Sequence, residues 1–87
     1  MPPTYKFKDF SIKPSTRLNK KYDVFKNNTY ITSFGDKRYQ HYKDKFGFYS
    51  HLDHLDPKRR EAYKARHKND NIDDPQYAGY WALKFLW

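Results

Sequence analysis

The segment from His51 to Asn69, HLDHLDPKRREAYKARHKN, holds the side chains of this protein that could do chemistry. Its histidines and aspartates are the residue types that bind zinc or iron, and His51 and His54 are spaced to meet on one helical turn. The pair lies just before a helix start at Asp56-Pro57, and no second ligand pair stands at a known spacing. We therefore expect no metal site, and we expect these histidines to hydrogen-bond locally and pack their rings.

An acid–base pair of histidine and aspartate, or an arginine–histidine nuclease centre, is the enzymatic interpretation of the same segment. Such a centre needs a concave pocket and a shell of residues that orients the catalytic groups. The sequence has no glycine-rich phosphate loop, no nucleophile elbow and no cysteine nucleophile. We therefore expect a protein that is not an enzyme, uses no cofactor and binds no small-molecule substrate.

Basic residues dominate both this segment and the whole chain. From Lys58 to Lys68, six basic residues accompany a single acid, Glu61. The complete sequence has a formal net charge of +8 and a pI of about 9.7. This balance indicates an anionic partner, and nucleic acid and an acidic protein surface fit the basic segment equally well. The candidate partner- or phosphate-binding residues are Lys13, Arg17, Lys20, Lys21, Lys58, Arg59, Arg60, Lys64 and Arg66.

Aromatic residues supply much of the apolar content of this 87-residue chain, which is one domain at most. The sequence has 9 Tyr, 7 Phe and 2 Trp, but one valine and three isoleucines. Part of this aromatic surface is therefore expected to contact a partner. No apolar run approaches the ~20 residues of a membrane span, and the first residues do not form a signal peptide. With no cysteine, a reducing interior is the expected setting.

Two helix starts are expected to position the basic segment and the aromatic C-terminal part. Asp56-Pro57 and Asp74-Pro75 each combine an aspartate N-cap with a proline at the first helical position. They predict a basic helix over residues 57–68 and an aromatic helix over residues 75–87. The aromatic helix is apolar on most sides, so it must be buried.

The N-terminal half is predicted from composition and turn signals. Residues 1–21 contain three prolines and many lysines, which is typical of an extended basic arm. Residues 22–34 are typical of an antiparallel hairpin, because Asn27-Asn28 suits a tight turn. Residues 37–50 are ambiguous, but their aromatic residues have helical spacing. The prediction is an α+β fold with an arm over 1–21 and one small domain over 22–87, which holds the hairpin and the C-terminal helices.

A spaced set of residues links the hairpin to the C-terminus: Phe34-Gly35, Tyr39, Tyr42, His54, Asp56, Arg60, Tyr63, Arg66-His67, Ala78-Gly79, Trp81 and Leu86-Trp87. On this pattern, residues 22–87 resemble a family of short virus-encoded proteins of unknown function, found in aquatic tailed phages and large DNA viruses. The resemblance implies a viral origin. It also implies a fold-defining position for His54, Asp56, Arg60, Tyr63, Arg66 and His67, of which Arg60, Arg66 and His67 either hold the fold together or bind a partner. We accordingly expect structural roles for His54, Asp56, Tyr63, His67, Asp74, Trp81 and Trp87.

These observations lead to two hypotheses of different class. The first is a minor capsid protein, a clamp or cement between larger capsid or virion proteins. Its arm would add a strand to neighbouring subunits and its basic helix would meet an acidic capsid surface or packaged DNA. It would reside in the virion, assembled in the host cytoplasm, without membrane contact. The alternative is a small viral nucleic-acid-binding protein, whose binding would weaken steeply with added salt.

Overall fold

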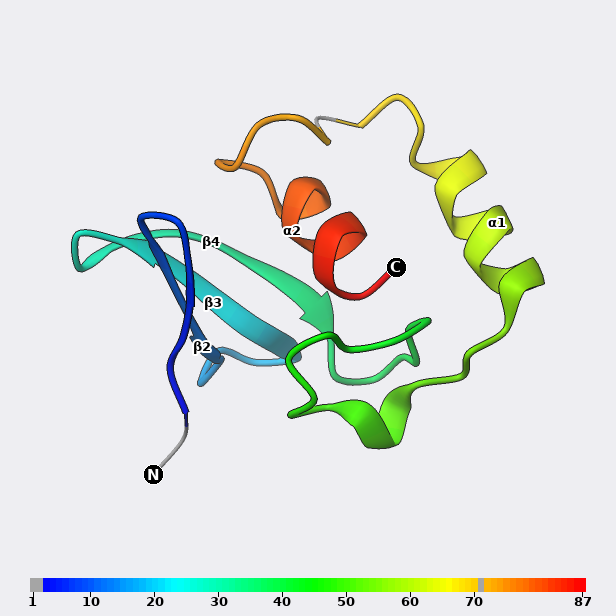
Figure 1. Ribbon diagram of the computed structural model, residues 1–87, viewed down its shortest axis with the longest axis horizontal. Helices are drawn as coiled ribbons and strands as arrows, with labels where there is room; N and C mark the ends of the chain where they lie inside the picture. Colours follow the sequence, from blue (N-terminus) through cyan, green and yellow to red (C-terminus); the bar gives the residue numbers. More distant parts are fainter. Residues whose placement is uncertain (1–2, 71) are drawn as a thin grey trace.

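The structure, a computed structural model, describes residues 3–70 and 72–87 and has an α+β architecture (Figure 1). A short 3-10 helix, η1 (Ser50–Leu52), precedes the helices α1 (Pro57–Arg66) and α2 (Ala78–Phe85). The sheet comes first in the chain, and its strands lie side by side in chain order: β1 (Tyr5–Phe7), β2 (Phe10–Pro14), β3 (Lys20–Lys26) and β4 (Thr29–Asp36). The predicted α+β class is confirmed.

The strands form an antiparallel meander because short turns join them. Asn27 and Asn28, between β3 and β4, have φ angles of 52° and 64°. Two consecutive residues with positive φ make the turn that best matches the twist of a hairpin, and asparagine tolerates this conformation. The hairpin predicted over residues 22–34 thus corresponds to β3 and β4, which are longer than predicted on the side away from the turn.

The segment of residues 1–21 is predicted as a separate arm, but its residues 5–7 and 10–14 form strands of the sheet. β1 pairs with β2, and β2 pairs with β3, where Ile12 stands opposite Val24. The prediction gave weight to the lysines and prolines, but strand side chains alternate between two faces, so charged and apolar residues can share one strand. The alternate residues that pack in the core are Tyr5, Phe7, Phe10 and Ile12. Met1 and Pro2 lie outside the described residues.

The hydrophobic core lies between one face of the sheet and α2. Trp81, on α2, is 0% exposed, and its ring contacts Phe7 and Phe10 edge-on and Phe34 in a stacked arrangement. The indole N–H of Trp81 donates to the carbonyl of Pro75 at 2.7 Å, which satisfies the polar atom of this side chain. The structure therefore places Trp81 in the interior, as its predicted structural role requires.

Residues 37–50, favoured as a helix from their aromatic spacing, form turns and the start of η1. The carboxylate of Asp44 accepts hydrogen bonds from the backbone N–H groups of Phe46 and Tyr49 at 2.9 and 2.8 Å. These bonds compete with helix formation, and Gly47 has a φ of 87°, which ends any helical run. Of the aromatic residues in this segment, Phe46 and Tyr49 pack in the core, whereas Tyr39 is 63% exposed, so the spacing does not reflect one helical face.

The second predicted helix start, at Asp74, is also corrected. The carboxylate of Asp74 accepts from the N–H of Gln76 at 2.9 Å, and the helix begins later, with Tyr77 as its N-cap. Pro75 is held outside the helix because its carbonyl binds the Trp81 indole. Tertiary packing of one tryptophan thus outweighs the local Asp-Pro signal, and α2 covers residues 78–85 rather than 75–87.

Helix α1 is the most peripheral element, and Figure 1 shows it on the opposite side of α2 from the sheet. None of its residues is buried. It begins as predicted, because the Asp56 carboxylate accepts from the N–H of Lys58 at 2.9 Å and Pro57 occupies the first turn. It ends at Arg66, two residues earlier than predicted. Within the described residues, no helix is long and apolar enough to cross a membrane.

Candidate functional site

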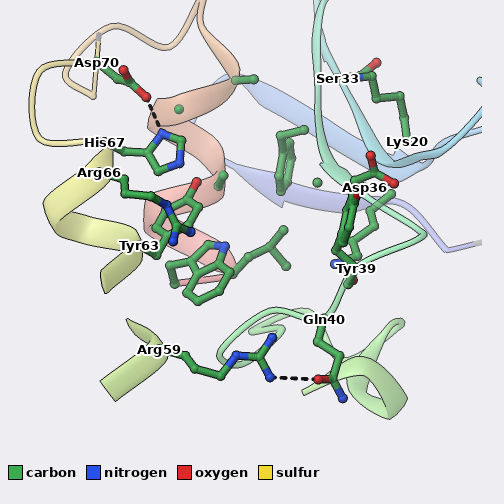
Figure 2. Close-up of a pocket in the computed structure, with 18 residues that line it drawn as sticks. Lys20, Ser33, Asp36, Tyr39, Gln40, Arg59, Tyr63, Arg66, His67 and Asp70 are labelled. Carbon is green, nitrogen blue, oxygen red and sulfur yellow. Dashed lines mark hydrogen bonds and ion pairs between the residues drawn. The ribbon is translucent and has the colours of Figure 1, made fainter. Parts of the chain in front are cut away.

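A cleft of about 540 Å³ opens between α1, α2 and the ends of β3 and β4 (Figure 2). Basic and aromatic side chains line much of it: Lys20, Arg59, Arg66, His67, Tyr39, Tyr63 and Trp87. Figure 2 shows Arg59 and Arg66 reaching from α1 toward the side formed by the strands. The cleft is therefore a hollow in a basic surface, and it is the candidate functional site.

A column of aromatic rings attaches α1 to the C-terminal end of α2 and forms one wall of the cleft. Tyr63 and Trp87 stack with ring centroids 4.1 Å apart and planes at 2°. His67 lies against Tyr63 at 4.2 Å, and His54 lies against Trp87 at 5.2 Å. The structure thus brings together four residues that were predicted to be structural, from three separate parts of the chain.

Arg60, predicted to bind a partner, is used inside the fold. Its Nε donates to the backbone oxygen of Trp87 at 2.6 Å, and its guanidinium lies 4.8 Å from the ring centroid of Tyr42. Because a planar guanidinium can bind oxygen and stack on a ring at once, Arg60 anchors α1 against the aromatic column. Of the two roles expected for Arg60, holding the fold together or binding a partner, these contacts match the first.

The prediction for Lys21 is corrected, because this residue is only 1% exposed. Its Nζ donates to the carbonyl of Tyr39 at 3.0 Å and to Nδ1 of His41 at 2.7 Å. His41 is equally buried, and its Nε2 lies 2.5 Å from Oδ1 of Asp53. The neutral ring of His41 accepts a hydrogen bond at Nδ1 and donates one at Nε2, so it links the buried ammonium of Lys21 to the carboxylate of Asp53. A buried lysine in this position cannot serve as a surface contact for phosphate.

The pKa values of these groups follow from burial. Burial lowers the pKa of Lys21 to about 8, although nearby carboxylates act in the opposite direction. Burial and the charge of Lys21 lower the pKa of His41, which keeps the imidazole neutral. The Tyr39 carbonyl is fixed by this cluster, and Tyr39 lines the cleft. The buried cluster therefore positions the wall of the cleft that faces α1.

Asp44 connects this buried cluster to the core. The hydroxyl of Tyr22 donates a short hydrogen bond to the Asp44 carboxylate, and the backbone N–H of Asp44 donates to Oδ1 of Asp53 at 2.8 Å. Burial and the Asp44 charge raise the pKa of Tyr22, so the phenol keeps its proton. These bonds hold residues 37–53 against β3, and so they stabilise the side of the cleft opposite α1.

The other predicted basic residues are spread over the surface. Lys20, Arg59 and Arg66 line the cleft. Lys64 lines a second cavity of about 300 Å³, which also lies between α1 and α2, and Lys58 is exposed. Lys13 and Arg17 lie elsewhere, with their charged groups 5.2 and 3.9 Å from the ring centroids of Phe25 and Tyr30. The predicted binding set is therefore not one patch: within the described residues, the members that line the cleft are Lys20, Arg59, Arg66 and the buried Lys21.

Ion pairing is distributed unevenly among these cations. Within residues 3–70 and 72–87, the lysines and arginines of α1 form no ion pair with a carboxylate. Of the acids that line the cleft, Asp36 is paired with Arg38 at 2.7 Å, and Oδ2 of Asp70 lies within hydrogen-bond distance of Nδ1 of His67, at 2.6 Å. The helix therefore presents positive charge that the described part of the protein does not neutralise.

Sequence reasoning missed several residues that build the site. Tyr39 and Gln40 line the cleft, and His41, Asp44 and Asp53 form the buried cluster behind it. The sequence did contain one signal for the role of Asp44. The spacing of Asp44 and Gly47 is typical of a turn in which an aspartate side chain accepts hydrogen bonds from the backbone N–H groups that follow it. No three histidine or acidic side chains in the described residues are placed to hold a metal ion.

Comparison with known proteins gives a family whose function is unknown. The model of a family of unknown function, DUF5754, matches residues 10–67 of this 87-residue chain. No curated protein and no solved structure matches this chain. The matched residues run from the start of β2 to just beyond the last residue of α1, so they include Arg59 and Arg66. Because the match covers more than half of the chain, this protein belongs to that family.

Proposed function

We propose that this protein binds nucleic acid through the basic helix α1 and the cleft beside it. The observation that carries the proposal is the set of α1 cations without carboxylate partners in residues 3–70 and 72–87. Uncompensated lysines and arginines attract polyanions, and a nucleic-acid backbone provides regularly spaced negative charge. Arginine suits this task because its fork of N–H donors matches a phosphate group.

The position of α1 also supports this function. The contacts of Arg60 and Tyr63 with Trp87 hold one side of α1 in place. Lys58, Arg59 and Arg66 are exposed, and the last two border the cleft. A phosphate backbone that follows α1 can therefore contact these cations without disturbing the contacts that hold the helix in place.

Binding to a labelled single-stranded oligonucleotide, measured by fluorescence anisotropy at several salt concentrations, tests the proposal. The logarithm of the binding constant should fall linearly with the logarithm of salt concentration. The double variant Arg59→Gln/Arg66→Gln should lower the steepness of that line by about 0.7 for each phosphate that the protein no longer neutralises.

The matched control is Lys43→Gln/Lys45→Gln, which removes the same amount of charge. Both lysines are exposed, and neither lines the cleft. This control should bind with nearly the same salt dependence as the wild-type protein. Equal losses of affinity in the two double variants would mean that net charge alone governs binding, and the assignment of binding to α1 would then be withdrawn.

A capsid-associated role is the second candidate, and exposed apolar side chains favour it. Leu18 is 86% exposed and Leu55 is 56% exposed, and a protein neighbour that covered them would remove apolar surface from water. In this role the protein would be a viral clamp that packs on larger capsid proteins, as the resemblance to virus-encoded proteins implies. Residues 5–14 already pair within the sheet, so the clamp would use its surface rather than a free arm.

Purified particles would separate the two candidates. Nuclease and salt would empty the particles of genome, and mass spectrometry would then follow this chain. Retention with the shell would support the capsid role. Release together with the nucleic acid would support the first proposal and would exclude a clamp held by protein contacts.

A further inference from the structure

The cleft has the size of a site for one nucleotide rather than for a duplex. Its volume of about 540 Å³ lies within the range of pockets that enclose small ligands, about 300–1,000 Å³. A base in a duplex is paired and stacked, so it cannot enter a pocket until it is unpaired and turned out of the helix. The dimensions of the cleft therefore favour an unpaired nucleotide.

The groups that line the cleft match the parts of a nucleotide. Arg59 and Arg66 approach from α1, and Lys20 lies on the strand side, so phosphate can be bound from either wall (Figure 2). The Nη1 of Arg59 donates to Oε1 of Gln40 at 2.9 Å. That bond fixes the orientation of the Gln40 amide, whose NH₂ group can donate to the edge of a base. The cleft thus offers both charge and a hydrogen-bond donor of defined position.

Tyr39 lines the cleft with an exposed ring, over which the guanidinium of Arg38 lies 5.6 Å from the centroid, so one face of this ring can stack on a base. The faces of Tyr63 are taken by Trp87 and His67, with centroid distances of 4.1 and 4.2 Å. Tyr39 is 63% exposed, and its backbone carbonyl is held by the buried ammonium of Lys21 at 3.0 Å. An exposed ring on a fixed backbone can stack on a base at a small entropic cost.

We propose that the cleft binds a single unpaired nucleotide, with its base against the ring of Tyr39 and its phosphate between Arg59 and Arg66. This inference rests on the nucleic-acid binding proposed above and specifies its substrate class, single-stranded rather than double-stranded nucleic acid. The carboxylate of Asp36 does not oppose it, because it is paired with the guanidinium of Arg38, and the carboxylate of Asp70 is held by Nδ1 of His67 at 2.6 Å.

Affinity for a single-stranded oligonucleotide and for the duplex of the same sequence, measured at one salt concentration, tests the inference. The wild-type protein should bind the single strand about tenfold more tightly. Tyr39→Ala should lower single-strand affinity about tenfold, since stacking of one base on an aromatic ring contributes about this factor, and should leave duplex affinity unchanged. Phe48→Ala is the control, because Phe48 is also exposed, at 43%, but does not line the cleft.

Filling the cleft gives a second test that leaves every charge in place. Gly79 lines the cleft, and a Cβ added there would meet only the Cβ of Asp70, at 3.7 Å. Gly79→Leu should therefore fold, as judged by circular dichroism, and should abolish the preference for the single strand. Gly79→Ala adds only a methyl group and should keep it.

The outcomes separate this inference from the proposed function. If single strand and duplex bind equally well, or if Tyr39→Ala and Gly79→Leu keep the wild-type preference, the nucleotide site is wrong while binding along α1 stands. If neither nucleic acid binds at low salt, the proposed function itself is wrong. Loss of single-strand preference in both variants, with duplex binding intact, is the expected result.

Discussion

Helices α1 and α2 have similar lengths but are held in the protein by different means. α2 places Trp81, Ala82 and Leu86, just past its end, in the core, whereas α1 has no buried residue at all. α1 is attached by one stack of rings, Tyr63 on Trp87, and by the hydrogen bond from Arg60 to the backbone of Trp87. The comparison teaches that burial of apolar surface stabilises one helix, while a few specific contacts keep the other in a position where its charges stay exposed.

The largest effect is expected from the helix in the core. Trp81→Ala should reduce the free energy of unfolding by about 3–5 kcal/mol, because it removes a fully buried indole and leaves a cavity. Urea unfolding followed by circular dichroism measures this change. Tyr77→Ala, at a side chain that is 49% exposed beside the same helix, is the control and should change stability little. Comparable destabilisation by both substitutions would remove the distinction between the helices.

A smaller and local effect is expected at the stack that holds α1. Tyr63→Ala should cost about 1–2 kcal/mol, because it removes a half-buried ring and its contact with Trp87. Amide hydrogen exchange should become faster in residues 57–67 and stay unchanged in the sheet. Faster exchange throughout the protein would show that α1 is an integral part of the core.

The two Asp-Pro pairs allow a still finer comparison. Asp56→Ala should destabilise α1 by about 1 kcal/mol, because the carboxylate accepts from the N–H of Lys58. Asp74→Ala should leave helix content unchanged, since the N-cap of α2 is Tyr77. Helicity and thermal unfolding of the two variants give the measurement. A loss of helix in the Asp74 variant would restore the longer helix that the sequence predicted.

The smallest effect is a dependence on pH near neutrality. Burial lowers the pKa of His41 and of His54 below the ordinary value of 6.5, so protons bind the unfolded chain more readily than the folded one. The free energy of unfolding should therefore decrease as the pH falls from 7.5 to 6.5. The effect is small because even the unfolded chain is only partly protonated in this range. His41→Asn should reduce the dependence, whereas His51→Asn, at an exposed residue, should preserve it.

Local signals in the sequence were sufficient where local bonds decide the structure. The turn at Asn27-Asn28 and the helix start at Asp56-Pro57 depend on neighbouring backbone, and both are present. The same signal failed at Asp74-Pro75 because a distant packing requirement, that of Trp81, controls the Pro75 carbonyl. The prediction of an extended arm, which was based on composition, was wrong for residues 5–14. These residues alternate between lysines on one face of the strands and apolar residues on the other.

The site was less predictable than the fold because its parts are distant in sequence. Arg59 and Arg66 could be identified from their charge alone. The residues on the opposite wall of the cleft, such as Tyr39, could not be identified in this way. Tyr39 is positioned by Lys21, 18 residues earlier in the chain, and Lys21 in turn depends on His41. The sequence predicts Lys21 to be a surface cation, because none of its neighbours in the chain indicates a buried partner. Such pairings follow from how the strands and loops pack, which local patterns do not encode.

The buried relay of Lys21, His41 and Asp53 has a consequence for how this protein can be altered. Replacing one member leaves a charge or a polar ring inside the protein without its partner, which is far more costly than removing the whole set. The three positions should therefore behave as one unit under substitution, with strongly non-additive energies between them. Each single substitution would therefore lower the stability of the folded protein. Simultaneous replacement of all three residues by apolar side chains of matching volume would avoid this loss of stability.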